Sequence, residues 1–147
     1  MDKDKPIIIG SDHAAFELKE KIKAWLLSKG YSVEDAGTHG PASVNYVDYG
    51  RKVAGAVSRG EFSWGILLCG TGLGMSMVAN RFPNVRAALC SDLFSARMSR
   101  VHNDSNILVL GGRILGDILA FELVQTWLDT GFEGGRHLER IQSIDAP

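Results

Sequence analysis

The stretch Trp64-Gly-Ile-Leu-Leu-Cys69-Gly-Thr71-Gly-Leu-Gly-Met75 decides the fold of this chain. Its first half is a short, continuous apolar run, which is typical of a strand buried on both faces. Gly70, Gly72 and Gly74 predict a tight turn into a helix, where the backbone comes close to a ligand. Ligands of open α/β sheets bind just beyond the carboxyl ends of the strands. We therefore expect Cys69 to stand at a ligand site.

The rest of the chain repeats this alternation of strand and helix. Apolar or β-branched runs predict strands at 6–10, 31–36, 65–69, 85–90 and 107–110. Helical spacing of apolar residues predicts helices at 16–26, 47–59, 73–81, 92–100, 117–128 and 136–142. This pattern predicts an α/β fold with a doubly wound, Rossmann-like, five-stranded parallel sheet and helices on both faces. An order of 2-1-3-4-5 would place Asp12 and His13 beside Cys69.

Length and composition exclude several classes of protein. The 147 residues predict one domain, 1–147. The formal net charge of −1 argues against nucleic-acid binding, and no apolar run reaches the ~18 residues of a membrane span. Two cysteines, Cys69 and Cys90, do not make a disulfide scaffold, so we expect free thiols and a cytoplasmic location. A regulatory disulfide stays conceivable if the two follow neighbouring strands.

The glycine turn matches no nucleotide-binding motif. It lacks the spacing of a dinucleotide fingerprint, and no Lys-Ser/Thr pair of a Walker A loop follows it. Its backbone donors suit an oxyanion or an anionic ligand, or the turn is only a tight connection. Cys69 is accordingly either a base or nucleophile near a helix N-terminus or a buried structural thiol.

Other polar side chains also have two interpretations. Asp12 is a helix cap or a ligand contact, and His13 is suited to an anion or a polarised oxygen. His102 either interacts with helix-terminal carbonyls or exchanges a proton with a sugar oxygen. Four basic side chains are either solvated surface charge or a phosphate-binding group: Arg113, Arg136, His137 and Arg140. The histidines and cysteines lack paired ligand spacing, so no metal site is expected.

Five motifs occur together in a fixed order: Gly10-Ser-Asp12-His13, Cys69-Gly-Thr-Gly-Leu-Gly74, His102-Asn-Asp-Ser-Asn106, Gly112-Arg113 and Gly134-Gly-Arg-His137. In this respect the chain resembles the ribose-5-phosphate isomerase type B family, over residues 6–145. The resemblance implies interconversion of D-ribose 5-phosphate and D-ribulose 5-phosphate in the pentose phosphate pathway. It implies neither a metal nor an organic cofactor.

The resemblance also implies residue roles. Cys69 would be the base that moves a proton between C2 and C1 through an enediolate. The N–H groups of Gly70, Gly72 and Gly74, with Thr71, would hold the oxyanion, and His102 would assist ring opening. The remaining contacts would be Asp12, His13, Tyr46 and Asn103 with the sugar, and Arg113, Arg136, His137 and Arg140 with the phosphate. The family works as a homodimer or homotetramer that shares its active sites, so the segment 132–147 is expected to reach a partner.

One loop departs from the family pattern. Where the family commonly has Asp-Tyr-Pro, this chain has Asn45-Tyr46-Val47. The change bears on the rigidity of the loop and on the choice between pentose and hexose phosphates. Two alternative functions follow: an isomerase of allose or galactose 6-phosphate, and a non-catalytic phosphate-binding module.

Overall fold

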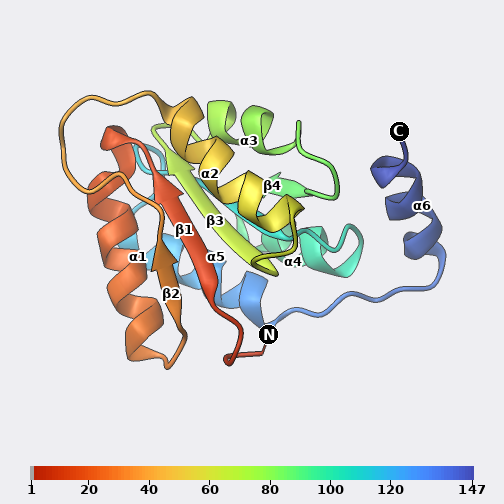
Figure 1. The fold of residues 1–147 in the computed structure, drawn as a ribbon. Coiled ribbons are helices and arrows are strands. Elements are labelled where there is room, and N and C mark those ends of the chain that lie inside the picture. Colours follow the sequence, from red (N-terminus) through yellow and green to blue (C-terminus); the bar gives the residue numbers. More distant parts are fainter. Residues whose placement is uncertain (1) are drawn as a thin grey trace.

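The structure, a computed structural model, describes residues 2–147 and has an α/β fold with a central sheet between helices (Figure 1). The strands are β1 (Ile7–Ser11), β2 (Val33–Asp35), β3 (Trp64–Cys69), β4 (Ala87–Leu89) and β5 (Ile107–Gly111). The helices are η1 (His13–Ala15), α1 (Phe16–Ser28), α2 (Tyr46–Ser58), α3 (Leu73–Ala79), α4 (Leu93–Val101), α5 (Asp117–Asp129) and α6 (Arg136–Asp145). All strand pairs are parallel, which confirms the predicted five-stranded parallel sheet.

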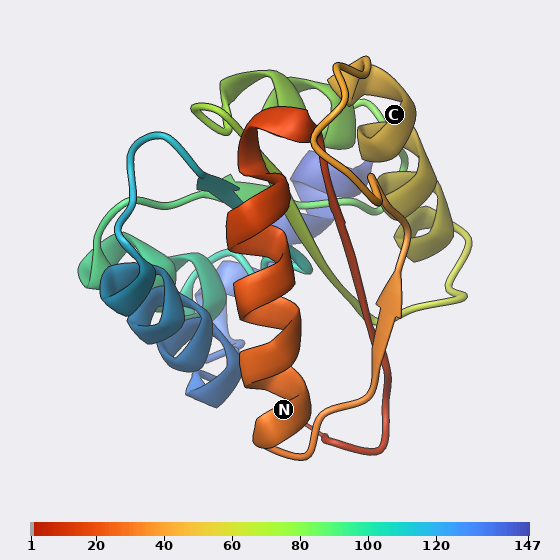
Figure 2. The same cartoon turned by 90° about the vertical axis from the view of Figure 1, so that its left-hand side faces the viewer.

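Helices cover both faces of the sheet, as the doubly wound pattern predicts. On one face, α1, α4 and α5 pack against the strand side that carries Ile9, Ile66 and Leu110. On the other face, α2 and α3 pack against the side that carries Ile8 and Leu67. Figure 2 shows α1, α4 and α5 on one side of the sheet and α2 on the other. Side chains alternate between the two faces of a strand, so the continuous apolar runs supply both cores. No helix within residues 2–147 combines the length and apolarity needed to cross a membrane.

The strand order is β2-β1-β3-β5-β4, so the predicted order 2-1-3-4-5 is wrong at one edge. Every residue of β5 is buried, whereas the three residues of β4 are only partly buried. An interior position covers both faces of the apolar β5, and a short strand of small residues is suited to an edge. The more apolar β5 therefore takes the interior position and β4 the edge, although β4 comes first in the sequence.

This order also separates the two cysteines. Cys69 ends β3 and Cys90 follows β4, and these strands are not neighbours because β5 lies between them. Two strand spacings of about 4.8 Å exceed the ~7 Å that a disulfide allows between Cα atoms. The expectation that both thiols follow neighbouring strands is wrong, and both are free.

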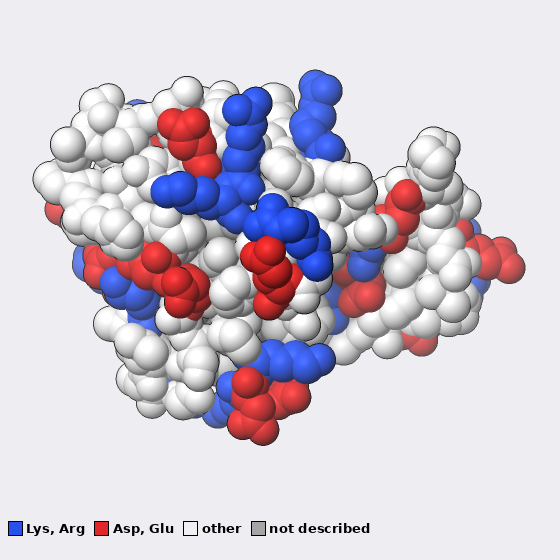
Figure 3. All heavy atoms as spheres, viewed as in Figure 1, with Lys and Arg blue, Asp and Glu red and all other residues white. Residues whose placement is uncertain are grey.

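Polar contacts satisfy the outer edge of β4, and one ion pair ties α6 to the neighbouring Arg86. The Asn80 side chain donates to the Ala87 carbonyl at 3.0 Å and accepts from the Ala87 N–H at 2.9 Å. Arg86 Nη1 forms an ion pair with Asp145 Oδ2 of α6 at 2.6 Å, and Ile144 lines a hollow beside Ala87. As a result α6 lies at the side of the sheet and forms the lobe on the right of Figure 3. On the face drawn there, Lys and Arg are interspersed with Asp and Glu.

Candidate active site

Cys69 is the last residue of β3, and its side chain is 5% exposed. Its Sγ accepts a hydrogen bond from the Gly72 N–H at 3.2 Å. A backbone donor aimed at sulfur can stabilise negative charge there. The thiol is thus both buried and directed at the glycine turn.

The glycine turn needs glycine for reasons of conformation and space. Gly72, the N-cap of α3, has φ +83°, a left-handed conformation, and a Cβ there would clash with Leu89. Thr71 Oγ1 accepts from the Leu73 N–H at 3.2 Å, so the Thr71 hydroxyl supports the start of α3. The N–H groups in the first turn of a helix have no intrahelical acceptor and can bind an anion, and here those of Gly72 and Leu73 are bonded to Cys69 Sγ and Thr71 Oγ1.

Asp12 lies beside Cys69, as the sequence predicts. Ser11 is in register with Leu68 across β1 and β3, so the next residues, Asp12 and Cys69, are neighbours. Asp12 Oδ1 accepts from the Ala15 N–H at 3.3 Å, which confirms the interpretation of Asp12 as a helix cap. Its Oδ2 makes no hydrogen bond within residues 2–147, so one carboxylate oxygen is still available for a ligand.

Tyr46 begins α2 and covers the glycine turn. A Cβ on Gly74 would lie 2.5 Å from Tyr46 Cε2, so the ring rests directly on the backbone of the turn. Asn45 caps α2, because its Oδ1 accepts from the Val47 N–H at 3.0 Å. A proline at position 47 has no N–H to donate. Asn45 and Val47 therefore form a cap that the family's usual proline does not allow.

His13 ties this edge of the sheet to the loop before α2. Its Nδ1 accepts a hydrogen bond from the Val44 N–H at 3.1 Å. His13 also lines a hollow of about 320 Å³ with Pro41 and Gly112. The imidazole therefore lies between the end of β1 and the loop 38–45.

Arg113 completes this group of residues. The Gly112 N–H donates to the Cys69 carbonyl at 2.8 Å, and the Arg113 N–H donates to the Gly70 carbonyl at 2.9 Å. The Arg113 side chain runs over the turn, with Cδ 3.4 Å from the position of a Cβ on Gly70. We call these residues the carboxyl-edge cluster: Asp12, His13, Tyr46, Cys69, the turn 70–74 and Arg113.

The other predicted site residues lie elsewhere in the chain. His102 is the C-cap of α4, which runs back from the carboxyl edge of the sheet, and nine residues of helix span about 13 Å. The His102 ring stacks on that of His137 in α6, with ring centroids 4.4 Å apart. We call this group the α6 cluster: His102, Asn103, Arg136, His137 and Arg140. The structure therefore divides the predicted site into two groups within one chain.

The α6 cluster is electrostatically suited to an anion. Arg136 and Arg140 are exposed, whereas His137 is 4% exposed and its Nε2 has no hydrogen-bond partner. Burial lowers the pKa of the His137 imidazole, and the neighbouring His102, Arg136 and Arg140 lower it further. An anion bound here would relieve the repulsion among these groups.

The partly buried Arg86 and the buried Arg100 position the α6 cluster, and the sequence reasoning missed both. Arg86 donates from Nε to the Asn103 carbonyl at 3.0 Å and pairs with Asp145 of α6. Arg100 donates to Asp104 at 2.7 Å and to the Thr130 carbonyl at 3.2 Å, before the segment that leads to α6. Partial burial is the signal of such a role, and a sequence does not reveal burial.

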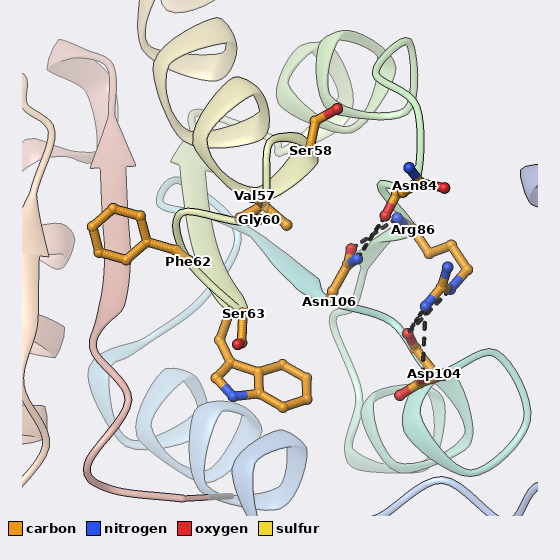
Figure 4. Close-up of a pocket in the computed structure, with 10 residues that line it drawn as sticks. Val57, Ser58, Gly60, Phe62, Ser63, Asn84, Arg86, Asp104 and Asn106 are labelled. Carbon is orange, nitrogen blue, oxygen red and sulfur yellow. Dashed lines mark hydrogen bonds and ion pairs between the residues drawn. The ribbon is translucent and has the colours of Figure 1, made fainter.

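A larger hollow lies near the amino ends of β3 and β5. Its volume is about 430 Å³, Trp64 lines it, and Figure 4 shows Arg86, Asp104 and Asn106 around it. Arg86 is paired with Asp104, and Asn106 Nδ2 donates to the Asn84 carbonyl at 2.8 Å. The arginine, aspartate and asparagine side chains here bond within the protein, whereas the buried Trp64 Nε1 has no hydrogen-bond partner within residues 2–147, and Cys69 is at the opposite end of β3.

One group of side chains has metal-ligand chemistry. Ligand atoms of His102, Glu133 and His137 lie within 4.8 Å of one another. The two imidazole planes are nearly parallel, at 20°, so their in-plane lone pairs do not point at a common centre. The neighbouring Arg136 and Arg140 also disfavour a cation. The geometry and the neighbouring charges of this group therefore do not suit a metal ion.

A buried ionic network holds the start of the loop before α2. Asp35, at the end of β2, pairs with the buried Lys19 and with Lys23, each at 2.7 Å. Its Oδ1 accepts from the Gly37 N–H at 2.9 Å. Burial raises the pKa of Asp35, but the two lysines and the Gly37 N–H outweigh burial and lower it to about 2. The carboxylate is thus held ionised where the loop leaves the sheet.

Fold and site together define a class: a doubly wound α/β protein with its candidate ligand site at the switch point between β1 and β3. A family model described as Ribose/Galactose Isomerase matches residues 7–144. The chain belongs to this family, whose curated members include proteins named as sugar phosphate isomerases, and it is an isomerase.

Individual relatives cover almost the whole chain. Ribose-5-phosphate isomerase B of Escherichia coli is 46% identical over 142 residues, which is 97% of this chain and 95% of that one. D-erythrulose-4-phosphate isomerase of Pectobacterium atrosepticum is 41% identical, over 94% of this chain and 91% of that one. The crystal structure of a ribose 5-phosphate isomerase of Thermotoga maritima superposes with a TM-score of 0.93 at 57% identity, over 96% and 97% of the two chains.

Proposed function

We propose that this isomerase interconverts D-ribose 5-phosphate and D-ribulose 5-phosphate, with Cys69 as the general base. The observation that carries the proposal is the Gly72 N–H aimed at Cys69 Sγ at 3.2 Å, within a turn of backbone donors. We place the reaction in the pentose phosphate pathway and the enzyme in the cytoplasm, as the sequence predicts. The relatives are named for sugar phosphates of four or five carbons, so the test of this proposal must compare sugars of different chain length.

The chemistry follows from the geometry. After ring opening, the Cys69 thiolate removes the proton on C2 of the aldose, and the electron pair moves to the C1 oxygen to give an enediolate. A proton passes from the C2 oxygen to the C1 oxygen, Cys69 returns its proton to C1, and C2 becomes the ketone carbon. A carbon acid of this kind is weak, so backbone donors must stabilise the developing oxyanion. The N–H groups of Gly70 to Gly74 are the donors within reach.

We further infer that a second copy of the chain completes each site. Helix α4 runs for about 13 Å from the carboxyl edge of the sheet to His102 of the α6 cluster. The six bonds from C1 to phosphorus reach only about 7 Å, if three bonds advance about 3.5 Å. One chain therefore cannot use both clusters on one pentose phosphate. Exposed apolar side chains near the carboxyl edge offer a surface for the second copy: Phe94, Ile114 and Ile118.

The Cys69 role is tested with pure enzyme and EDTA on ribose 5-phosphate, with ketose appearance as the readout. We expect Cys69→Ala to lower kcat by about 10²–10⁴, the usual contribution of a general base, without a loss of folding. Cys90→Ala is the matched control, because Cys90 is also a buried thiol, and it should retain turnover. Retained turnover in Cys69→Ala contradicts the proposal. Loss of ketose from erythrulose 4-phosphate, and ketose appearance from allose and galactose 6-phosphate, in parallel assays determine the substrate.

The shared site is tested by mixing two inactive variants. Cys69→Ala lacks the base and Arg140→Ala lacks a phosphate contact, so each alone should be nearly inactive. In a mixed dimer, one site combines an intact Cys69 with an intact Arg140 of the other copy. Random exchange at 1:1 should restore about a quarter of wild-type activity. No recovery after exchange, verified by mass spectrometry of the mixed dimer, contradicts a shared site.

A further inference from the structure

One hydrogen bond determines which ring nitrogen of the neutral His13 imidazole carries the proton. Its Nδ1 accepts from the Val44 N–H at 3.1 Å. An imidazole nitrogen accepts only when it carries no proton, so the neutral ring carries its proton on Nε2. Nε2 makes no hydrogen bond within residues 2–147, and it is not among the buried unpartnered atoms. The ring therefore offers one free donor at the carboxyl edge.

The same bond fixes a short run of consecutive residues. Val44 donates to His13, Asn45 caps α2, and Tyr46 rests on Gly74 of the glycine turn. At its other end the loop is held by the Thr38 N–H, which donates to the Ser11 carbonyl at 2.8 Å. The end of β1 is thereby connected through the loop to the backbone next to Cys69.

We propose that His13 is a positioning residue and a donor only: its Nδ1 latches the loop 38–45, which places Tyr46 over the glycine turn, and this leaves its Nε2–H for the sugar contact that the family resemblance implies. The second half of this statement rests on the proposed function. His13 keeps its proton throughout the reaction, so it does not act as a base. Protonation of Nδ1 would remove the acceptor and open the latch.

Two substitutions separate the two nitrogens. The side-chain oxygen of asparagine can occupy the position of Nδ1, so His13→Asn keeps the acceptor for Val44 and loses the Nε2 donor. The amide nitrogen of glutamine can occupy the position of Nε2, so His13→Gln keeps the donor and loses the latch. His39→Asn is the matched control, because His39 lies exposed on the same loop.

The latch is tested without substrate. In ¹⁵N-histidine spectra above pH 8, His13 should show the Nε2–H tautomer, assigned by its absence in His13→Asn. Hydrogen exchange at the Val44 amide should be protected in the wild type, His39→Asn and His13→Asn, and about tenfold faster in His13→Gln. A proton on Nδ1, or equal exchange in the wild type and His13→Gln, overturns the latch.

Kinetics test the donor. His13→Asn should lower kcat/KM by about tenfold, with the acid limb of the pH–rate profile unchanged, and His13→Gln should mainly raise KM. An acid limb that disappears in His13→Asn overturns the donor-only assignment, because it identifies His13 as a titrating base. Absence of any wild-type isomerase turnover refutes the proposed function, and the spectra and exchange rates still decide the latch.

Discussion

Replacing Gly74 by alanine should lower the isomerase activity while the stability of the fold changes little. A Cβ at Gly74 would lie 2.5 Å from Tyr46 Cε2, 2.7 Å from Cζ and 3.1 Å from the hydroxyl oxygen. Carbon atoms in contact are normally 3.5–4.0 Å apart, so the ring must move by about 1 Å. Displacements of this size in a positioned site can cost about 10² in rate. We expect kcat/KM for ribose 5-phosphate to fall by about that factor.

The stability of Gly74→Ala should change little. Alanine in place of glycine in a helix gains about 1 kcal/mol, which offsets the cost of moving Tyr46. The Tyr46 ring is 39% exposed and can swing towards solvent, so the crowding is relieved at the surface. The melting temperature should therefore shift by only about 2–4 °C in either direction.

A double-mutant cycle with Tyr46→Ala tests the reasoning. Removal of the ring removes the clash, so Gly74→Ala should cost almost nothing in activity when Tyr46 is already alanine. If Gly74→Ala costs the same factor in both backgrounds, the added methyl group acts directly on the oxyanion donors. That result would refute the role given to the Tyr46 contact.

Three further predictions concern charge and the thiols. The Asp35 pKa of about 2 lies below its ordinary 3.8, so its pairing stabilises the fold above pH ~4 and is lost as the pH falls towards 2. Asp35→Asn should remove about 2 kcal/mol of this acid-dependent stability and destabilise the enzyme at pH 7 by removing one of the two carboxylates that pair with the buried Lys19, as urea unfolding at each pH will show. Asp145→Ala should release α6 and raise KM several-fold with kcat nearly unchanged, whereas an unchanged KM contradicts the anchoring role of the ion pair. Burial raises the pKa of Cys90 to about 11, so brief iodoacetamide labelling at pH 8 should modify Cys69 and not Cys90, and mass spectrometry of the labelled peptide decides this.

The carboxyl-edge cluster was predictable because local rules determine it. An apolar run followed by alternating glycines predicts the end of a buried strand, and parallel strands bring their carboxyl ends to one edge. These rules predict Asp12 beside Cys69, and the register of β1 and β3 confirms it. The roles of the site residues stay predictions, including the oxyanion contact of Thr71.

The order of the last two strands was not predictable from the alternation of elements alone. It depends on which strand gains more from burial on both faces, and the continuous Ile-Leu-Val-Leu run of β5 exceeds the Ala-Ala-Leu of β4. The positioning roles of Arg86 and Arg100 also escaped prediction. Their contacts are with backbone carbonyls of distant segments, which leave no periodic trace in the sequence.

The two bonds between Asn80 and Ala87 have a consequence for colloidal behaviour. A sheet whose last strand has vacant N–H and C=O groups is a template on which another molecule can add a strand and begin to precipitate. Here one carboxamide occupies both groups of Ala87, as a neighbouring strand would. This side chain acts as a gatekeeper against edge-to-edge aggregation, and its loss should shorten the shelf life of concentrated enzyme before it affects turnover.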